Sequence, residues 1–530
     1  MPGNVLIVDA LSAGSGRRTS SRDSIGCGPR TIAGVLERHS IHCRISRIED
    51  LLQAPKMLRK FDHLALSAMT MDLPASIQLL KKWRHEQPRG RVVVGGPLSS
   101  DPKGVLSLLK PDVLVVGEGE STLDELLMIN FLDDNPSLSE VVGVAYLRGN
   151  AVQINEHRPF ISESTWSKKF TPSSTRIVDY SDYQAARVYV EVLRGCSNFG
   201  RPTLPLPNGR ECTDCDNCRS DDMKLRMDCP EDIPPGCGFC SVPNTWGPPR
   251  SRSTESIVKE IRQLVDLGVH RIVLEAPDFL DYSRGIRITD PCGPAANLEA
   301  IGALLDSLNE IQEIRKGSVH LTIENMKACL FTEEVAAILS GSLSSISPNI
   351  GLETGSDEHM VQIGKCGNAA NVLRAVRVAK KHGMTPFIYF IYGLPGETPE
   401  SIQASVRLMQ EVSEAGAERI ILYGFRPLPG SAFEEFPEPR SNDPISEPLR
   451  IEAARINRSK KSRYVGLLVK GVAAEPSWSR HGYTMVYPLA EGPLMTIKGG
   501  YSAGTILNLR VTKVLSAGLL EAEVAESLES

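Results

Sequence analysis

The sequence predicts an α/β protein with three folded parts. These are an N-terminal doubly wound, flavodoxin-like domain, a central partial (β/α)6 barrel with a cysteine-rich insertion, and a small C-terminal β-barrel. Three patterns support this prediction. Apolar runs alternate with helical patterns in the first 130 residues, a second alternating series begins near residue 186, and short strand-like runs follow residue 460. A chain of 530 residues can hold several such domains.

The first part, residues 1–135, is expected to form a parallel sheet buried on both faces. Its strands are predicted at 5–8, 64–67, 91–94 and 113–116, and its helices at 29–39, 74–87, 103–109 and 121–131. Ligands of such sheets bind at the carboxyl ends of the strands. Candidate contacts there are Ser67, Thr70, Gly95, Gly96, Gly117 and Glu118. Small residues at these positions would let the backbone approach a bulky planar ligand. The pattern lacks the third glycine of a dinucleotide fingerprint.

A connector, residues 136–185, carries weak β signals and leads into the central part, residues 186–445. Strands are predicted there at 187–193, 270–275, 318–323, 345–351, 386–392 and 418–423. Helices are predicted at 254–267, 296–313, 331–340, 368–382 and 398–415. Six β/α units with right-handed crossovers make an open relative of the eight-fold barrel, whose active sites lie at the carboxyl ends of the strands.

The last part, residues 446–530, contains short strand-like runs at 464–469, 484–487, 494–497 and 506–511. Gly, Ser and Pro separate these runs, which favours a small β-barrel.

Composition narrows the function classes. A net charge of −5 gives no overall attraction to nucleic acid, and no apolar run is long enough to span a membrane. The N-terminal residues lack the basic start of a signal peptide. Of the 12 cysteines, seven lie between residues 196 and 240. Clustered cysteines in a chain that is not secreted favour metal ligation over disulfides, so a reducing cytoplasm is the expected compartment.

Three of these cysteines, Cys196, Cys237 and Cys240, are candidate ligands of a catalytic [4Fe–4S] cluster. Three thiolates hold three irons and leave the fourth iron open for a substrate or cofactor, whereas a purely structural cluster uses four. Cys196 follows the first predicted barrel strand directly. An alternative is that Cys229 replaces Cys196 as the first ligand.

The remaining cysteines of the insertion, residues 197–236, form a candidate second site of four thiolates. The spacing of the first three and the proline after the fourth are typical of bacterial ferredoxins, which favours an auxiliary iron–sulfur cluster. A closed zinc site fits the long last gap as well, and a site without metal is the third alternative. This second set is Cys212, Cys215, Cys218 and Cys229.

Four segments in this order resemble the radical S-adenosylmethionine (SAM) superfamily. They are Arg194-Gly195-Cys196 with Cys237-Gly238-Phe239-Cys240, then Glu275-Ala276-Pro277-Asp278, Gly351-Leu352-Glu353-Thr354-Gly355, and Gly393-Leu394-Pro395-Gly396. With the N-terminal domain, the chain resembles the cobalamin-dependent branch, whose members methylate carbon centres. The family usually separates its first two cysteines by three residues, whereas about forty separate them here.

The resemblance implies that the open iron chelates SAM, which is cleaved after one-electron reduction to a 5′-deoxyadenosyl radical. It implies SAM contacts by Phe239, Glu275, Glu353, Ser356, Gly393 and Pro395. It also implies that the small residues at the N-terminal strand ends contact cobalamin. No Asp-x-His-x-x-Gly run is present, so no imidazole is expected below the cobalt.

The resulting hypothesis is a radical methyltransferase that modifies an unactivated carbon and needs a low-potential electron donor. The resemblance implies a protein side chain as substrate, with a glutamine of methyl-coenzyme M reductase as the specific expectation. A tRNA methylthiotransferase is the alternative, although that family would have three more cluster cysteines in the first domain, where only Cys27 and Cys43 occur. A non-catalytic corrinoid or redox sensor is a third hypothesis.

Two groups of residues remain. The C-terminal part resembles small RNA-binding modules, and its candidate phosphate contacts are Lys470, Arg480, His481, Lys498 and Arg510. The alternative is that these residues form a solvated rim on a barrel that closes the active site. The five cysteines outside the cluster window are expected to be ordinary core or surface residues. They are Cys27, Cys43, Cys292, Cys329 and Cys366.

Overall fold

The computed structural model describes residues 3–18, 22–440, 443–516 and 518–525. The chain divides into two compact units. Unit 1 comprises residues 1–183, 188–190 and 255–268, and unit 2 comprises residues 184–187, 191–254 and 269–530. No helix among the described residues is long and apolar enough to cross a membrane.

Unit 1 is built on a seven-stranded sheet of order β3-β1-β4-β5-β6-β7-β8. The first five strands are parallel, and the β7–β8 hairpin continues the sheet antiparallel. The strands are β1 (Val5–Asp9), β3 (Cys43–Arg47), β4 (His63–Ser67), β5 (Val92–Gly95), β6 (Val113–Val115), β7 (Val144–Arg148) and β8 (Ala151–Ile154). The parallel part has the flavodoxin-like order, which confirms the predicted doubly wound fold. The sequence analysis missed β3 because its Cys-Arg-Ile-Ser-Arg sequence is too polar to look like a buried strand.

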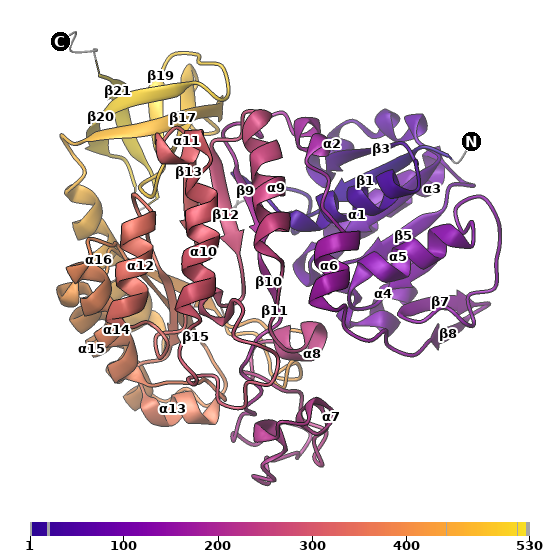
Figure 1. The fold of residues 1–530 in the computed structure, drawn as a ribbon, viewed down its shortest axis with the longest axis horizontal. Helices are drawn as coiled ribbons and strands as arrows, with labels where there is room; N and C mark the ends of the chain where they lie inside the picture. The colour runs from indigo at the N-terminus through magenta and orange to yellow at the C-terminus, as the bar shows by residue number, and fades with distance from the viewer. Residues whose placement is uncertain (1–2, 19–21, 441–442, 517, 526–530) are drawn as a thin grey trace. The chain divides into compact units, whose positions relative to one another are not determined.

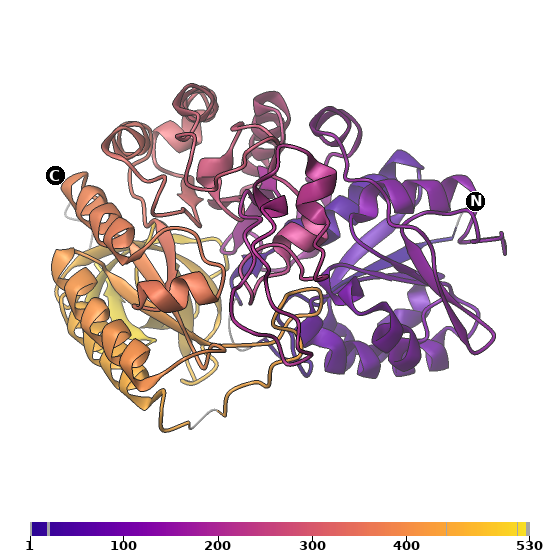
Figure 2. The ribbon, with the colours of Figure 1, turned by 90° about the horizontal axis from the view of Figure 1, so that it is seen from below.

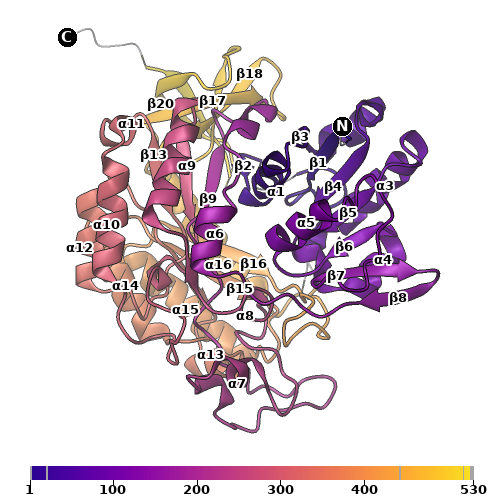
Figure 3. The same ribbon diagram turned by 45° about the vertical axis from the view of Figure 1, so that its right-hand side comes forward.

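Helices flank this sheet, and Figure 3 shows them on its two faces. The helices are α1 (Cys27–Arg38), α2 (Ile48–Gln53), α3 (Leu73–Glu86), α4 (Pro102–Leu109), α5 (Gly119–Met128) and α6 (Glu163–Lys169). The buried side chains of the sheet form one core with Leu79, Trp83 and Leu106 from α3 and α4. Two buried polar contacts attach later segments of the chain to this sheet and its first helix. The Tyr180 hydroxyl donates to Asp9 at 3.0 Å, and Arg30 pairs with Glu260 at 2.7 Å.

Unit 2 contains the barrel strands, which form two parallel groups. β12 (Arg271–Glu275) pairs with β13 (His320–Ile323), and β14 (Asn349–Glu353), β15 (Phe387–Tyr392) and β16 (Arg419–Gly424) form a second sheet. The Met326 N–H donates to the Asn349 carbonyl at 2.8 Å, so one backbone hydrogen bond connects the two groups. The first barrel strand, β9 (Arg187–Glu191), leads into this unit, where the Val192 N–H donates to the Glu275 carbonyl at 2.9 Å. The predicted partial barrel is therefore confirmed.

Helices of unit 2 cover the outside of these strands and appear as an arc of pink and orange ribbons in Figure 2. They are α10 (Leu298–Asn309), α11 (Gln312–Arg315), α12 (Glu333–Ser342), α13 (Asp357–Gln362), α14 (Ala369–Lys381), α15 (Pro399–Ala415) and α16 (Glu447–Ser462). The helix that follows β9, α9 (Thr254–Asp266), lies mostly within unit 1. Thr398 caps α15, accepting a hydrogen bond from the Ser401 N–H at 3.2 Å, as its sequence predicts. The sequence analysis missed α16 and assigned its residues to the C-terminal β domain.

The cysteine-rich insertion has little regular structure. Its elements are a 3₁₀ turn (Asn217–Arg219) and α7 (Met223–Met227), and the short elements β10 (Leu193–Arg194), α8 (Val242–Trp246) and β11 (Arg250–Ser251) flank it. Two buried arginines hold the insertion. Arg201 donates to the carbonyls of Ile233 and Arg226, each at 2.9 Å, and Arg226 donates to the carbonyl of Ile288. These bonds supply order that the insertion cannot obtain from an apolar core of its own.

The C-terminal residues form a closed barrel of order β17-β18-β19-β21-β20. Figure 1 labels four of its strands, and Figure 3 labels β18. The strands are β17 (Leu468–Pro476), β18 (Tyr483–Pro488), β19 (Met495–Lys498), β20 (Ile506–Val514) and β21 (Leu520–Val524). The predicted barrel is confirmed, although β21 was not predicted and the first strand begins later than expected. Two of the predicted phosphate contacts have protein partners, because Arg480 pairs with Glu521 at 3.0 Å and Arg510 donates to the Gly466 carbonyl at 3.2 Å.

Candidate functional site

The structure brings Cys196 together with Cys237 and Cys240 in unit 2. Asn198 links two of these cysteines, because its backbone N–H lies 3.4 Å from the sulfur of Cys196 and its side-chain amide lies 3.2 Å from the sulfur of Cys237. A tight turn joins the other pair, with the Cys240 N–H donating to the Cys237 carbonyl at 2.8 Å. Cys229 and Cys212 pack against an apolar cluster whose buried members include Leu206 and Ile233 of the insertion and Leu394 and Phe433 from later in the chain.

Two glycines make this arrangement of cysteines possible. Gly195 has φ +86°, and a Cβ atom there would lie 2.1 Å from the carbonyl oxygen of Pro248. A Cβ atom on Gly238 would lie 2.4 Å from the ring of Phe433. Both contacts are impossible for any other residue type, which gives a physical reason for glycine beside each cysteine.

The chemistry of the three thiols suits metal ligation. Desolvation by the surrounding protein raises the pKa of the Cys196 thiol to about 12, although the nearby Lys327 ammonium lowers it. Burial likewise raises the pKa of the Cys237 and Cys240 thiols. Without a cation these groups stay protonated at neutral pH, whereas a bound metal cluster would stabilise the thiolate forms. Three such donors therefore fit a [4Fe–4S] cluster with one open iron.

A buried ion-pair network lies beside Cys196. Lys327 contacts Asp278 at 3.0 Å and Asp281 at 2.7 Å, and it donates to the Ser197 hydroxyl at 2.7 Å. Ser197 donates to Asp281 from both its N–H, at 3.1 Å, and its hydroxyl, at 3.0 Å. Burial alone would lower the pKa of Lys327, but the two aspartates raise it well above its usual value. The sequence analysis missed Lys327 and Asp281 because neither lies in a motif.

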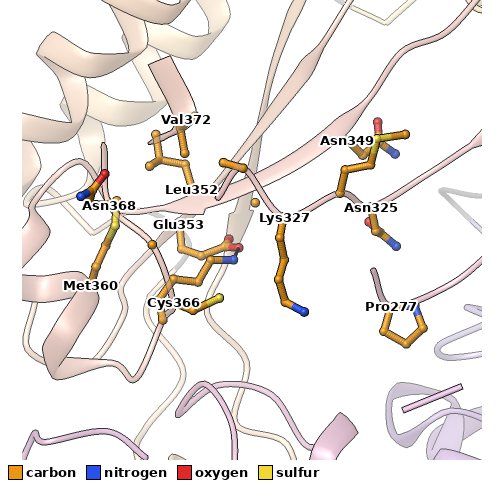
Figure 4. Close-up of a pocket in the computed structure, with 15 residues that line it drawn as sticks. Pro277, Asn325, Lys327, Asn349, Leu352, Glu353, Met360, Cys366, Asn368 and Val372 are labelled. Carbon is orange, nitrogen blue, oxygen red and sulfur yellow. Dashed lines mark hydrogen bonds and ion pairs between the residues drawn. The ribbon is translucent and has the colours of Figure 1, made fainter. Parts of the chain in front are cut away.

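A pocket of about 150 Å³ opens next to this network and contains the predicted SAM contact Glu353. Glu353 sits at the end of β14 with φ +68°, and its carboxylate pairs with Lys365 at 2.9 Å. Figure 4 shows Glu353 beside Cys366, and the side chain of Lys327 lies on a neighbouring segment of the same pocket. A Cβ atom on Gly351 would lie 2.3 Å from the Glu353 carboxylate, so this glycine makes room for the ion pair. Strained backbone of this kind is concentrated at ligand sites.

The other predicted SAM contacts lie on different elements of unit 2. The Ser356 hydroxyl caps α13 by accepting the His359 N–H at 3.3 Å. Phe239 packs against the same apolar cluster as Cys229. Glu275 lies at the carboxyl end of β12. Pro277, from the same motif as Glu275, lines the pocket.

Two side chains that were not predicted hold the Gly393–Gly396 loop. His359 donates from Nε2 to the Pro395 carbonyl at 2.9 Å, and the Gly393 N–H donates to Glu397 at 2.9 Å. Gly393 itself has φ +71°, which glycine adopts without strain. Burial raises the pKa of Glu397 from 4.5 to about 7.

The pKa of Glu397 predicts a pH-dependent stability. Because the folded-state pKa is higher than the unfolded one, this carboxyl stabilises the fold fully below pH 4.5, and the contribution is lost as pH rises through about 7. The Glu397→Gln variant keeps an oxygen acceptor for Gly393 without the buried charge. We expect the unfolding free energy of the wild type to fall, relative to this variant, by up to about 3 kcal/mol between pH 5 and pH 8. Urea titrations at several pH values measure this difference, and parallel pH profiles for the two proteins would contradict it.

The candidate cobalamin contacts lie at the carboxyl edge of the unit 1 sheet. Gly117 has φ +77° with open space at its Cβ position, and Met69 and Met71 are each 36% exposed near the end of β4. A Cβ atom on Gly96 would lie 2.8 Å from the Ala68 carbonyl, so this glycine allows close backbone packing. Open backbone and exposed apolar side chains at a sheet's switch point fit a large planar cofactor.

The other candidate cobalamin contacts at this edge lie on different elements of unit 1. Ser67 and Gly95 end the neighbouring strands β4 and β5, and Thr70 begins the short 3₁₀ turn after β4. The Glu118 carboxylate accepts the Ile161 N–H at 2.6 Å, which gives this residue a structural partner.

Comparison with known proteins agrees with the two domain types. A model of the B12 binding domain matches residues 19–127, and a model of the radical SAM superfamily matches residues 229–409. In structure, the chain is similar to a radical SAM methyltransferase, TsrM from Kitasatospora setae, solved with cobalamin and a [4Fe–4S] cluster. The TM-score is 0.56 at 15% identity, over 82% of this chain and 77% of TsrM. The two domain matches and the fold therefore define a radical SAM enzyme with a B12-binding domain, whose cofactors are a [4Fe–4S] cluster, SAM and cobalamin.

Two full-length relatives give the particular family. The chain is 39% identical to protein MK0932 of Methanopyrus kandleri, over 100% of this chain and 97% of the relative. It is 38% identical to protein MJ1620 of Methanocaldococcus jannaschii, over 93% of each. The chain belongs to the family of these two proteins. More distant similarity, at 24% identity over 70% of the chain, connects it to the putative methylthiotransferase MJ0865 of the latter organism.

Proposed function

We propose that this protein is a cobalamin-dependent radical SAM C-methyltransferase that methylates an unactivated carbon of a protein side chain. The observation that carries the proposal is the presence, in one chain, of the Cys196–Cys237–Cys240 site and a flavodoxin-like domain that matches the B12 binding model. When bound, the three cofactors supply reductive cleavage of SAM, abstraction of a hydrogen atom from carbon and a methyl group for that carbon.

The residues of unit 2 would position the reactants. The three thiolates would hold the cluster, and the Asn198 amide and backbone N–H would orient two of their sulfurs. Glu353 and Lys365 present one negative and one positive charge to the pocket, which suits the amino and carboxylate groups of the methionine part of SAM. The turn that carries Phe239 would offer backbone groups to the adenine.

Proton transfer is not expected to limit the key step, because a bond between carbon and a methyl group forms without an acid or base. The charged groups near Cys196 agree with this view. Lys327 is held by two carboxylates, and its pKa lies well above the usual value, so it is a poor proton donor at neutral pH. We infer that it contributes positive charge and positioning instead.

The two other hypotheses have less support. A methylthiotransferase of the usual type would need a three-cysteine site in the first domain. Cys43 is instead buried in β3, and the described residues of unit 1 contain no group of three close metal-ligating side chains. The closed C-terminal barrel is compatible with RNA binding, and Lys470 and Lys498 are exposed on it. A non-catalytic sensor would not need the charged pocket beside the thiols.

The proposal can be tested with the full-length protein, reconstituted anaerobically with iron, sulfide, cobalamin and a low-potential reductant. SAM with a deuterated methyl group is added, and mass spectrometry follows 5′-deoxyadenosine and S-adenosylhomocysteine. We expect both products to form, and the Cys240→Ala variant to form neither. Transfer of sulfur together with the methyl group would identify a methylthiotransferase, and the absence of any SAM turnover would identify a sensor.

The substrate class needs a separate measurement. A peptide that contains the modified glutamine of methyl-coenzyme M reductase is the first candidate, and a peptide with alanine at that position is the matched control. Incorporation of the deuterated methyl group into the first peptide alone would support this substrate. SAM cleavage without peptide methylation would leave the methyltransferase class intact and would contradict this particular substrate.

A further inference from the structure

Three cysteines that the sequence analysis treated as unrelated meet in unit 2. The ligand sulfurs of Cys292, Cys329 and Cys366 all lie within 4.8 Å of one another. Cys292 and Cys329 form a disulfide in the structure, with Cα atoms 5.4 Å apart. Among the described residues, this is the one group of three or more Cys, His, Asp or Glu side chains with such spacing.

The topology explains why these distant residues meet. Cys292 lies between β12 and α10, Cys329 follows β13, and Cys366 lies between β14 and α14. Three consecutive strand-to-helix connections therefore each contribute one cysteine. Because the carboxyl ends of parallel barrel strands share one edge, the sulfurs converge there although 37 residues separate each cysteine from the next.

Each connection is held in place by contacts that do not involve sulfur. The Cys292 N–H donates to Asp290 at 2.8 Å. Arg374 of α14 donates to the carbonyls of Ala328 and Cys329, each at 3.2 Å. Lys365, beside Cys366, is fixed by its ion pair with Glu353. The three thiols are thus positioned by the surrounding fold, as the ligands of a built metal site are.

A simple disulfide does not account for the group. A disulfide uses two sulfurs, so it does not explain why the sulfur of Cys366 lies within 4.8 Å of both. Lys327 and Lys365 line the same pocket as Cys366 and place two ammonium groups on its side of the group. In addition, an enzyme that works with a low-potential reductant operates under conditions that reduce most disulfides.

We propose that Cys292, Cys329 and Cys366 bind a single thiophilic divalent cation, zinc, with the fourth position filled by a non-protein ligand. Tetrahedral zinc with Zn–S bonds of about 2.3 Å holds its sulfur ligands about 3.8 Å apart, inside the 4.8 Å within which the three sulfurs lie. Its binding requires Cys292 and Cys329 as thiolates instead of the disulfide that they form in the structure. A four-iron cluster holds its ligands around a larger core. The sulfurs of Cys196, Cys237 and Cys240, which are described by the structure, do not all lie within 4.8 Å of one another. Three protein ligands with one open position are typical of zinc sites that bind a small ligand.

The position of the site suggests what the ion does. Cys366 lines the same pocket as Glu353, Lys365 and Lys327 (Figure 4). An ion that joins the three connections would fix the segments that carry Lys327 and Lys365, and so would preorganise this wall of the pocket. This inference concerns metal binding and does not depend on methyl transfer, so the two proposals can fail separately.

The first test uses the wild-type, full-length protein purified anaerobically without added thiols. Cysteines are alkylated before and after treatment with a zinc chelator, and peptides are mapped by mass spectrometry. We expect Cys292, Cys329 and Cys366 to be protected together, and to become reactive together when zinc is removed. A Cys292–Cys329 disulfide that opens with a reductant rather than with the chelator would overturn the proposal.

The second test measures zinc and iron per chain in variants. Cys366→Ser should lose about one zinc relative to the wild type while its iron content stays unchanged, which also shows that the catalytic site has folded. Cys27→Ser, a thiol in unit 1, is the matched control and should lose neither metal. Cys212→Ser separates this ion from any metal of the insertion, because it should keep the zinc of the new site. Unchanged zinc in Cys366→Ser, or a loss of about four irons, would overturn the assignment.

Discussion

The Cys196→Ser variant is expected to lose the catalytic cluster and nearly all SAM cleavage, whereas Cys229→Ser keeps both. Asn198 contacts the sulfurs of both Cys196 and Cys237, which places Cys196 beside a predicted cluster ligand. A serine at position 196 removes one of three cluster ligands. The rate of 5′-deoxyadenosine formation should fall by more than about 100-fold, beyond the effect of losing a residue that only supports a ligand.

Iron content and the electron paramagnetic resonance signal of the reduced protein provide the second readout for this pair of variants. Cys196→Ser should lose the signal of the cluster that binds SAM. Cys229→Ser should keep it, and should lose metal from the insertion if the four cysteines there form a closed site. The reverse result, with activity lost in Cys229→Ser and kept in Cys196→Ser, would show that Cys229 is the first ligand.

The second large effect is expected from Lys327→Met. Lys327 is the buried partner of both Asp278 and Asp281, and methionine preserves its length without its charge. Two carboxylates would then lie close together with no cation between them, although Arg284 still contacts Asp281. Removing one partner of a buried ion pair costs about 3–5 kcal/mol, so the denaturation midpoint of unit 2 should fall clearly.

A double variant distinguishes stability from function at this position. Lys327→Met combined with Asp278→Asn removes one unpaired charge and should recover part of the lost stability. Cluster reduction and SAM cleavage should remain impaired in the double variant, because the positive charge beside Cys196 is still missing. Equal stability of the wild type and Lys327→Met would contradict the role of this network.

Local patterns in the sequence were sufficient to predict the fold class, and a local motif predicted the three thiols as a candidate site. Buried parallel strands need near-continuous apolar runs, so β1, β4, β5 and β6 could be recognised one by one. Cys237-Gly238-Phe239-Cys240 forms its turn from neighbouring residues, with the Cys240 N–H donating to the Cys237 carbonyl at 2.8 Å. Features whose cause lies within a few residues are visible in the sequence.

Features that depend on distant partners were not visible. The polar strand β3 is a strand because it pairs with β1, and Lys327 has a role because Asp278, Asp281 and Ser197 surround it. Cys292, Cys329 and Cys366 carry no motif spacing and meet because three parallel strands end at one edge of the barrel. The sequence by itself determined the domain types and the cluster motif, since periodicity and turn chemistry act locally. Only the tertiary structure decided which charges and thiols share a site, because such contacts are set by how the chain returns to the same strand edge.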